Sequence, residues 1–365
     1  MKKGLAIFVY VLMFFVGVSV LHAQTVTNVT SEQVGKTIHV SYNLDKQADI
    51  TLFVSTDGGR TYTQLYRVSG DVGKNVSAGH KTIVWDVLAE REKLMGENIV
   101  FKVKAEGHYD LTFTVNGVTF KMIYVQGGSF TMGECKTKKR KRNKYYRGLA
   151  HNVTLSDFYI GETEVTQELW KAVMGDDLYF LDWDKGRGNN IPVYNMSWYK
   201  GQKFVRKLND LTGVTFRFPT ETEWEYAARG GNQSQGFAYA GSDLPDDVSW
   251  HWGNSGDYYL KGKWNYKKLE KSHGRPHPVK TKFPNELGIY DMSGNVQEWC
   301  EDWYGNYNFS EHVNPKGPTS GSYKVVRGGC WVHDAEWGLV ENRFGWNSPE
   351  SRYHGIGFRL VLIRH

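Results

Sequence analysis

Residues 217–231, which read RFPTETEWEYAARGG, constrain the fold more than any other part of the sequence. Thr220 and Glu223 have the spacing of a capping box, in which the threonine oxygen accepts from the Glu223 amide and the glutamate returns to the Thr220 amide. The helix that begins there runs to about Ala228, because two glycines follow and glycine commonly ends a helix. With 40 glycines and 15% aromatic residues, the chain is predicted to be loop-rich but well cored, since buried rings offset the entropy of ordering loops.

The same half of the chain contains other predicted elements. Residues 166–174 and 197–211 are predicted as amphipathic helices, the second with a serine cap and a glycine stop. Residues 113–125 are predicted as a hairpin that turns at an Asn-Gly pair. The rest consists of short strands, turns and aromatic loops. These features predict an α+β class in which the helices are minor elements.

Six further blocks follow one another in a distinctive order. They are residues 127–133 (GGSFTMG), 158–166 (FYIGETEVT), 192–198 (PVYNMSW), 285–299 (NELGIYDMSGNVQEW), 327–329 (RGG) and 355–359 (GIGFR). Together with residues 217–231, they resemble the formylglycine-generating enzyme (sulfatase-modifying factor) family over about residues 111–363. The resemblance implies a C-type-lectin-like, loop-rich α+β fold for a domain at residues 111–365.

Residues 24–107 are predicted as a separate all-β module, a sandwich of immunoglobulin or fibronectin type. The alternation of residues 37–42 is typical of a half-buried strand. Further short strands are predicted at 50–54, 61–66, 82–85 and 99–103. Residues 55–62 (STDGGRTY) resemble the Asp-box of sialidases, which stabilises a hairpin, and a single copy argues against a propeller.

Residues 1–23 are predicted to be an export signal. Lys2 and Lys3 precede an apolar run at 5–21, and Ala23 offers a small residue before a cleavage point. An uncleaved anchor is the alternative, although the run is slightly short for a spanning helix. Export would place the protein in the periplasm, on the outer surface or outside the cell, where disulfides are possible. It also argues against a nucleic-acid partner.

The catalytic positions of the family are occupied by other residues in this chain. Enzymes of the family carry two cysteines just after a Gly-Gly pair, and these thiols bind copper and activate oxygen. The matching positions here are His333 and Gly338. Because copper(I) favours two close thiolates, copper is not expected as a cofactor. The alternative is a mixed site of Cys330 and His333, which are the remaining catalytic candidates.

The chain has three cysteines, Cys135, Cys300 and Cys330, so at least one is free or pairs with another chain. In bacterial relatives, a cysteine at the position of Cys300 pairs with one near the position of Gly338. The resemblance therefore implies a disulfide between Cys300 and Cys330. Closing that loop would contribute about 3 kcal/mol by restricting the unfolded chain.

The resemblance also implies a structural calcium ion in the loop at residues 291–298. Asp291 and Glu298 offer carboxylate oxygens, and Gly294 and Val296 offer backbone carbonyls across a tight turn. An acidic turn without an ion is the alternative. A second family calcium site would use Asn254 and Ser255, but a lysine at position 271 falls near the place of its acidic partner.

The basic run at residues 136–147 (KTKKRKRNKYYR) contains eight Lys or Arg residues. It is interpreted either as a solvated insertion or as a contact with an acidic partner or an anionic glycan. The whole sequence predicts an exported, non-catalytic binding or structural scaffold with a protein or glycan partner, which is compatible with a place in a cell-envelope assembly. The alternative is a copper-dependent oxidase that converts a sulfatase cysteine to formylglycine.

Overall fold

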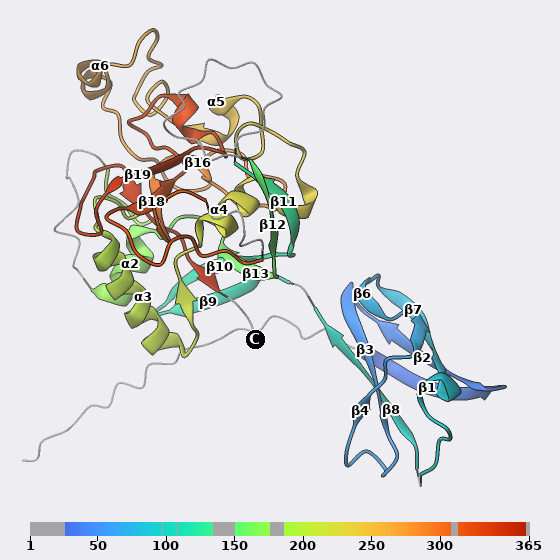
Figure 1. Ribbon diagram of the computed structural model, residues 1–365. Coiled ribbons are helices and arrows are strands. Elements are labelled where there is room, and N and C mark those ends of the chain that lie inside the picture. The colour runs from blue at the N-terminus through green and yellow to red at the C-terminus, as the bar shows by residue number, and fades with distance from the viewer. Residues whose placement is uncertain are drawn as a thin grey trace, which may run out of the picture. The chain divides into compact units, whose positions relative to one another are not determined.

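The computed structural model describes residues 26–96, 98–107, 109–133, 150–175, 186–307 and 313–362 (Figure 1). The predicted export signal, Cys135 and the basic run at 136–147 lie outside these residues. Contacts within the chain divide it into two units, with the boundary between Tyr109 and Asp110. In the part that the structure describes, no helix has the length and apolar character needed to cross a membrane.

The N-terminal unit is all-β, as predicted. One sheet has the order β1-β2-β7-β5, and the other has the order β4-β3-β6 with β8 paired to β3. The elements are β1 (Val26–Val34), β2 (Thr37–Leu44), β3 (Ala48–Ser55), β4 (Thr63–Gln64), β5 (Val68–Gly70), β6 (Gly73–Val76), β7 (Gly79–Asp86), α1 (Val87–Glu90) and β8 (Val100–Glu106). Their inward side chains form one core that includes Tyr42, Leu52 and Trp85.

The turn after β3 shows why one predicted strand is shorter than expected. Residues 61–66 were predicted as a strand, but pairing in β4 begins only at Thr63. The Asp57 carboxylate accepts hydrogen bonds from the Arg60 and Thr61 amides at 3.0 and 2.9 Å. These amides are therefore committed to the turn and cannot join the sheet, which agrees with the hairpin-stabilising role of this motif.

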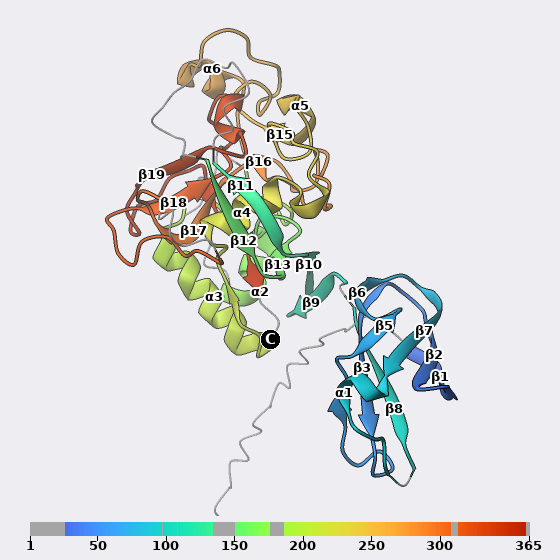
Figure 2. The same ribbon diagram turned by 45° about the vertical axis from the view of Figure 1, so that its right-hand side comes forward.

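The C-terminal unit is mixed α+β, and its first sheet has the order β14-β21-β13-β10-β9. These strands are β9 (Leu111–Val115), β10 (Val118–Val125), β13 (Phe158–Gly161), β14 (Phe216–Arg217) and β21 (Val361–Leu362). Helices α2 (Gln167–Met174) and α3 (Trp198–Thr212) pack on one another and on strands of this sheet (Figures 1 and 2). Both predicted helices are confirmed, and Thr166 and Ser197 cap them through their side-chain oxygens.

The second sheet of this unit, with the order β19-β18-β17-β20, carries the candidate site. It consists of β17 (Gln297–Trp303), β18 (Lys324–Arg327), β19 (Arg343–Asn347) and β20 (Ile356–Gly357). The remaining elements are short: β11 (Gly128–Met132), β12 (His151–Leu155), α4 (Glu221–Ala228), η2 (Gly231–Gln233), α5 (Pro245–Val248), β15 (Ser249–Trp250), α6 (Tyr266–Lys271), β16 (Ser293–Gly294) and η3 (Ala335–Gly338). Loops therefore make up much of the unit, as the glycine content predicts.

Helix α4 lies at the centre of the unit, and all of its residues are buried. The predicted capping box is present, because Thr220 accepts from the Glu223 amide and Glu223 accepts from the Thr220 amide. The helix also places Glu221 and Glu225 where buried arginines from β18 and β19 reach them. This arrangement neutralises carboxylates that would otherwise be costly to bury.

Candidate functional site

The two catalytic candidates from the sequence do lie together. Cys330 follows β18 after a Gly-Gly turn, and its Sγ lies 3.3 Å from His333 Nδ1. The other ring nitrogen, His333 Nε2, lies 3.3 Å from the Tyr353 hydroxyl. A backbone hydrogen bond from the His333 amide to the Cys330 carbonyl, 2.9 Å long, closes the turn between them. The result is a row of thiol, imidazole and phenol.

All three groups in this row are uncharged at neutral pH. Burial raises the pKa of the Cys330 thiol to about 12. Burial, reinforced by the nearby His354, lowers the pKa of His333 to about 3. Burial also raises the pKa of Tyr353 well above its ordinary value. Because the thiolate is the form that binds metal and attacks electrophiles, a protonated Cys330 is suited to packing rather than to either task.

The positions that carry thiols in the related enzymes have a different use here. The His333 ring stacks on Trp337 with 4.0 Å between ring centroids, and Trp337 in turn stacks on Phe344 at 5.1 Å. Gly338 presents no side chain at all. A Cβ added there would have the Gly328 carbonyl oxygen as its nearest neighbour, at 3.3 Å. The site is therefore an aromatic stack beside a closely packed glycine.

The structure contradicts the predicted disulfide, because Cys300 and Cys330 are both free, buried thiols. In the antiparallel ladder of β17 and β18, Glu298 faces Arg327 and Trp299 faces Val326. Going from Glu298 toward Cys300 therefore moves along β18 away from Cys330, so the two cysteines do not face each other. The two cysteines also pack into separate hydrophobic clusters. A resemblance to a family does not specify the strand register or the sheet face of each cysteine, and these decide whether two cysteines can form a disulfide.

The loop predicted to bind calcium is tightly wound. Asp291, Gly294 and Asn295 have positive φ angles of 59°, 82° and 56°. One Asp291 oxygen accepts from the Lys280 amide at 2.9 Å. The two Glu298 oxygens accept from the Arg359 guanidinium at 2.6 and 2.7 Å. The four predicted ligands thus belong to one compact turn, but Glu298 already has a cationic partner.

The charges around this turn fit a divalent cation. Glu164 joins the turn by accepting from the Val296 amide at 3.3 Å, so three buried carboxylates lie near the single guanidinium of Arg359. Burial, together with the neighbouring Asp291 and Glu298, raises the pKa of Glu164 well above its usual range. A cation with oxygen ligands would offset this excess of negative charge. The carboxylate of Asp291 and the carbonyls of Gly294 and Val296 would hold it, with Glu298 shared with the guanidinium.

Among the residues that the structure describes, other donors do not form an additional metal centre. Within the described ranges, no three His, Cys, Asp or Glu side chains are grouped as metal ligands, so backbone carbonyls would have to complete the calcium turn. At the second expected calcium position, Asn254 donates to the Ser249 carbonyl at 2.9 Å and Ser255 donates to the Trp331 carbonyl at 2.8 Å. These two side chains therefore serve the internal hydrogen-bond network.

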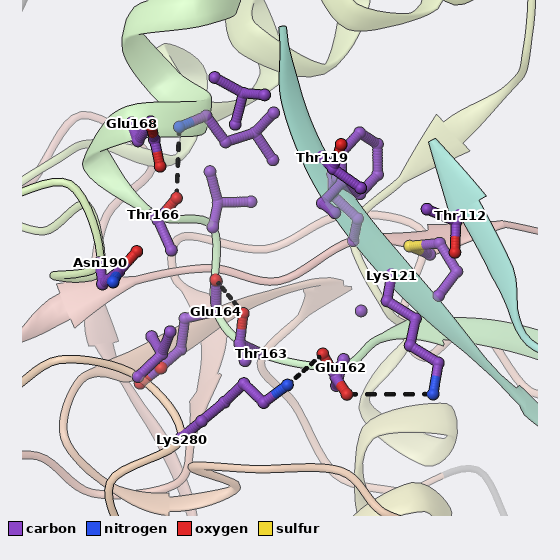
Figure 3. Close-up of a pocket in the computed structure, with 18 residues that line it drawn as sticks. Thr112, Thr119, Lys121, Glu162, Thr163, Glu164, Thr166, Glu168, Asn190 and Lys280 are labelled. Carbon is purple, nitrogen blue, oxygen red and sulfur yellow. Dashed lines mark hydrogen bonds and ion pairs between the residues drawn. The ribbon is translucent and has the colours of Figure 1, made fainter. Parts of the chain in front are cut away.

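A pocket of about 350 Å³ lies beside β10 and the chain that leads into α2 (Figure 3). Lys280 Nζ lies 2.9 Å from one Glu162 oxygen, and Lys121 Nζ lies 4.0 Å from the other. Lys121 also pairs with Asp110 at 2.7 Å. Both lysines of this pocket are therefore paired with carboxylates.

A family model for the sulfatase-modifying factor enzyme 1-like domain matches residues 112–363. The chain belongs to this family. Its sulfatase-modifying factor domain is the C-terminal unit, with the buried α4 and the Cys330–His333 pair described above. The expected C-type-lectin-like, loop-rich fold is confirmed, together with the all-β region that precedes it.

Two relatives of this sulfatase-modifying factor domain differ in what their names say. The chain is 36% identical over 248 residues to the chaperone protein LppX of Paenibacillus barcinonensis. This alignment covers 59% of this chain and 80% of that protein. It is 34% identical over 185 residues to the formylglycine-generating enzyme of Streptomyces coelicolor, which covers 48% of this chain and about half, 54%, of the enzyme. Among solved structures, Treponema denticola variable protein 1 aligns with a TM-score of 0.56 and 30% identity, over 69% of this chain and 98% of that one.

Sequence reasoning found Cys330 and His333 but missed their partners. Tyr353 lies 20 residues from His333 along the chain, and nothing in the local pattern relates the two. Trp337 is closer, and its spacing of four residues from the histidine was a usable signal for stacking. The partners matter because they fill the space around the imidazole with aromatic rings.

Proposed function

We propose that this chain is an exported, non-catalytic member of the family that acts as a binding or structural scaffold for a protein partner. The proposal rests on the side chains that occupy the positions of the family's catalytic thiols. Of the cysteines that the structure describes, only Cys330 lies in this site, and its neighbour His333 is a neutral imidazole stacked on an indole. A copper(I) ion that prefers two thiolates would find one protonated thiol.

The kind of partner is inferred from the family and the fold. A relative that is 36% identical over most of its length is named a chaperone, which supports a role in binding another protein. A rigid core that carries long aromatic loops also suits recognition, because such loops vary without disturbing the scaffold. Export is inferred from the predicted signal at residues 1–23 and is consistent with a place in a cell-envelope assembly.

Calcium is proposed as a structural ion rather than a reagent. The turn at residues 291–298 links β16 to β17 and lies next to the buried Arg359 and Glu164. Binding there would neutralise buried carboxylates and stiffen the entry to the second sheet.

An aldehyde assay tests the proposal directly. The mature chain is incubated with copper, oxygen and a Cys-x-Pro-x-Arg peptide, with the Streptomyces coelicolor enzyme as the positive control. We expect no aldehyde above the copper-only blank. Aldehyde formation that is lost in Cys330→Ala would overturn the proposal and support the copper-dependent oxidase instead.

A matched variant separates the missing thiols from a general loss of the fold. His333→Cys combined with Gly338→Cys restores sulfur at both family positions, and the space at Gly338 admits a Cβ with small adjustment. We expect this double variant to bind copper(I) while the wild-type chain does not. If the wild-type chain bound copper(I) as tightly as the double variant, the absence of paired thiols would not explain inactivity.

A further inference from the structure

A segment at residues 256–275 exposes an unusual number of aromatic side chains. Tyr258, Tyr259, Trp264 and Tyr266 are between 39% and 55% exposed although all four fall within residues 258–266. Exposed aromatic residues at this density are uncommon on a protein that works alone and are typical of interaction sites. We call residues 256–275 the aromatic segment.

The aromatic segment is anchored to the domain at several points. Leu260 and Leu269 are buried in the main hydrophobic cluster of the C-terminal unit. The Asp257 amide donates to the Ser272 carbonyl at 2.7 Å, which closes the two ends of the segment on each other. Because the backbone is held in this way, its exposed rings can be used for binding with little loss of conformational entropy.

The segment also borders the Cys330–His333 pair. The Trp264 indole donates to the Val332 carbonyl at 2.7 Å. Trp252 connects the two regions, because its indole donates to the Asn265 carbonyl of the segment at 3.1 Å and its amide donates to the His333 carbonyl at 2.7 Å. The Tyr266 ring lies 6.5 Å from the ring of His354. In both views α6, which belongs to this segment, lies at the edge of the unit (Figures 1 and 2). A partner docked on the segment would therefore lie next to the position that performs chemistry in the related enzymes.

Charge sets the chemistry of the partner. The aromatic segment contains six Lys or Arg residues and two acidic residues. One of the acidic residues, Asp257, is already paired with Arg275 at 2.7 Å and with His273 at 2.7 Å. The lysines at positions 261, 263, 267 and 268 are exposed and alternate with the aromatic residues. The segment therefore presents aromatic rings among positive charges, and it complements an acidic surface.

We propose that the aromatic segment is the docking surface for an acidic polypeptide, which rests on the scaffold function proposed above. Protein interfaces have aromatic residues at their centre and charged residues at their rim, and Trp and Tyr contribute most to their affinity. Here the aromatic residues occupy the middle of the segment and lysines flank them. An anionic glycan would use the same basic groups, so it is tested as the alternative occupant.

The test uses the full mature chain and three probes of known composition. They are a random copolymer of glutamate and tyrosine, poly-glutamate of the same length, and a heparin hexasaccharide, each followed by fluorescence anisotropy at two salt concentrations. Because residues 136–147 would also attract acidic probes, every measurement is repeated with the basic residues of that run replaced by glutamine. We expect the copolymer to bind more tightly than poly-glutamate in both backgrounds.

Variants locate the binding. Trp264→Ala and Tyr258→Ala are each expected to weaken copolymer binding about tenfold, as for a central aromatic residue of an interface. Lys263→Glu with Lys267→Glu should weaken it further and reduce its salt dependence. Tyr199→Ala removes a side chain that is 49% exposed on α3 and serves as the matched control, with no change expected. Tyr258 provides a second variant if loss of the Trp264 hydrogen bond disturbs folding.

Each other outcome overturns the inference. If poly-glutamate and the copolymer bound with equal affinity and Trp264→Ala had no effect, the segment would recognise only negative charge. Tighter binding of heparin that depends on Trp264 would assign the surface to a glycan, and no binding of any probe would remove it altogether. The aldehyde assay is independent of these results, so failure of the docking surface and failure of the non-catalytic proposal are distinguished.

Discussion

Two groups of buried polar residues in the C-terminal unit differ in charge. Around α4, carboxylates face guanidinium groups: Glu221 lies 2.6 Å from Arg343, and Arg327 pairs with Glu225. Arg359 pairs in the same way with Glu298, which accepts from the Trp224 indole of α4 at 2.7 Å. We call these three ion pairs the ionic framework. Around Cys330, the thiol, imidazole and phenol are all neutral. The first group ties together segments that are far apart in sequence, whereas the second fills the space where the related enzymes hold copper. Because the ionic framework makes no use of the positions of the family's thiols, the fold can be kept when other residues occupy those positions.

The largest effect is expected from breaking the ionic framework. Arg359 is fully buried and holds Glu298 at 2.6 Å beside two further buried carboxylates. Arg359→Met should lower the free energy of unfolding by about 3–5 kcal/mol, because it leaves a buried negative charge without its partner. Chemical denaturation measures the change, and Arg352→Met, at an exposed position, is the control. A loss below about 1 kcal/mol would show that the framework does not maintain the fold.

Packing around the neutral site gives the next effect. A Cβ at Gly355 would overlap the Cys330 sulfur. Gly355→Ala is therefore expected to cost about 1–3 kcal/mol through overpacking. Adding Cys330→Ala should recover part of this loss, since it removes the overlapping atom, and thermal denaturation of the four proteins in the cycle measures the coupling. Additive losses would mean that the sulfur does not occupy the position described here.

Features formed by residues close together in the sequence were predictable, whereas contacts between distant residues were not. The caps at Thr166, Ser197 and Thr220 are hydrogen bonds within one helical turn, and each was predictable from its own neighbours. The fold class was predictable because seven blocks occur in one order. The pairing of Arg359 with Glu298 spans 61 residues, and no local pattern indicates it.

The predicted disulfide is the instructive error. Cys300 belongs to β17 and Cys330 follows β18, so their separation depends on the register of these two strands and on which face each side chain takes. A shift of one residue moves a side chain to the opposite face of a sheet. Sequence alone does not resolve a one-residue difference between distant strands, so the thiols were predicted to meet although they pack in different clusters.

The neutral character of His333 gives the protein a pH dependence. Its pKa is lowered from 6.5 to about 3 in the folded chain, so the unfolded chain binds the extra proton between these values. Stability from this group is thus complete above pH 6.5 and falls by about 1.4 kcal/mol per pH unit as the pH drops toward 3. His333→Gln should make the free energy of unfolding less sensitive to pH between 6.5 and 5. The exposed His273→Gln is the control, and equal slopes in all three proteins would contradict a buried neutral imidazole.

The smallest effect is expected from calcium, which tests whether the ionic framework includes a bound ion. If 10 mM calcium exceeds the Kd tenfold, it should stabilise the chain by about 1.4 kcal/mol relative to chelator. Asp291→Asn should abolish the rise in Tm, and the exposed Asp210→Asn should retain it. An unchanged Tm in the wild-type chain would favour an acidic turn without an ion.

Copper(I) titration against a chromophoric chelator tests the central claim most directly, because it needs no knowledge of a substrate. The reduced, mature chain is compared with Cys330→Ala and with the double variant that restores both family thiols. We expect copper to stay with the chelator in the presence of the wild-type chain and to move to the double variant. Transfer of one copper per wild-type chain that is lost in Cys330→Ala would contradict it.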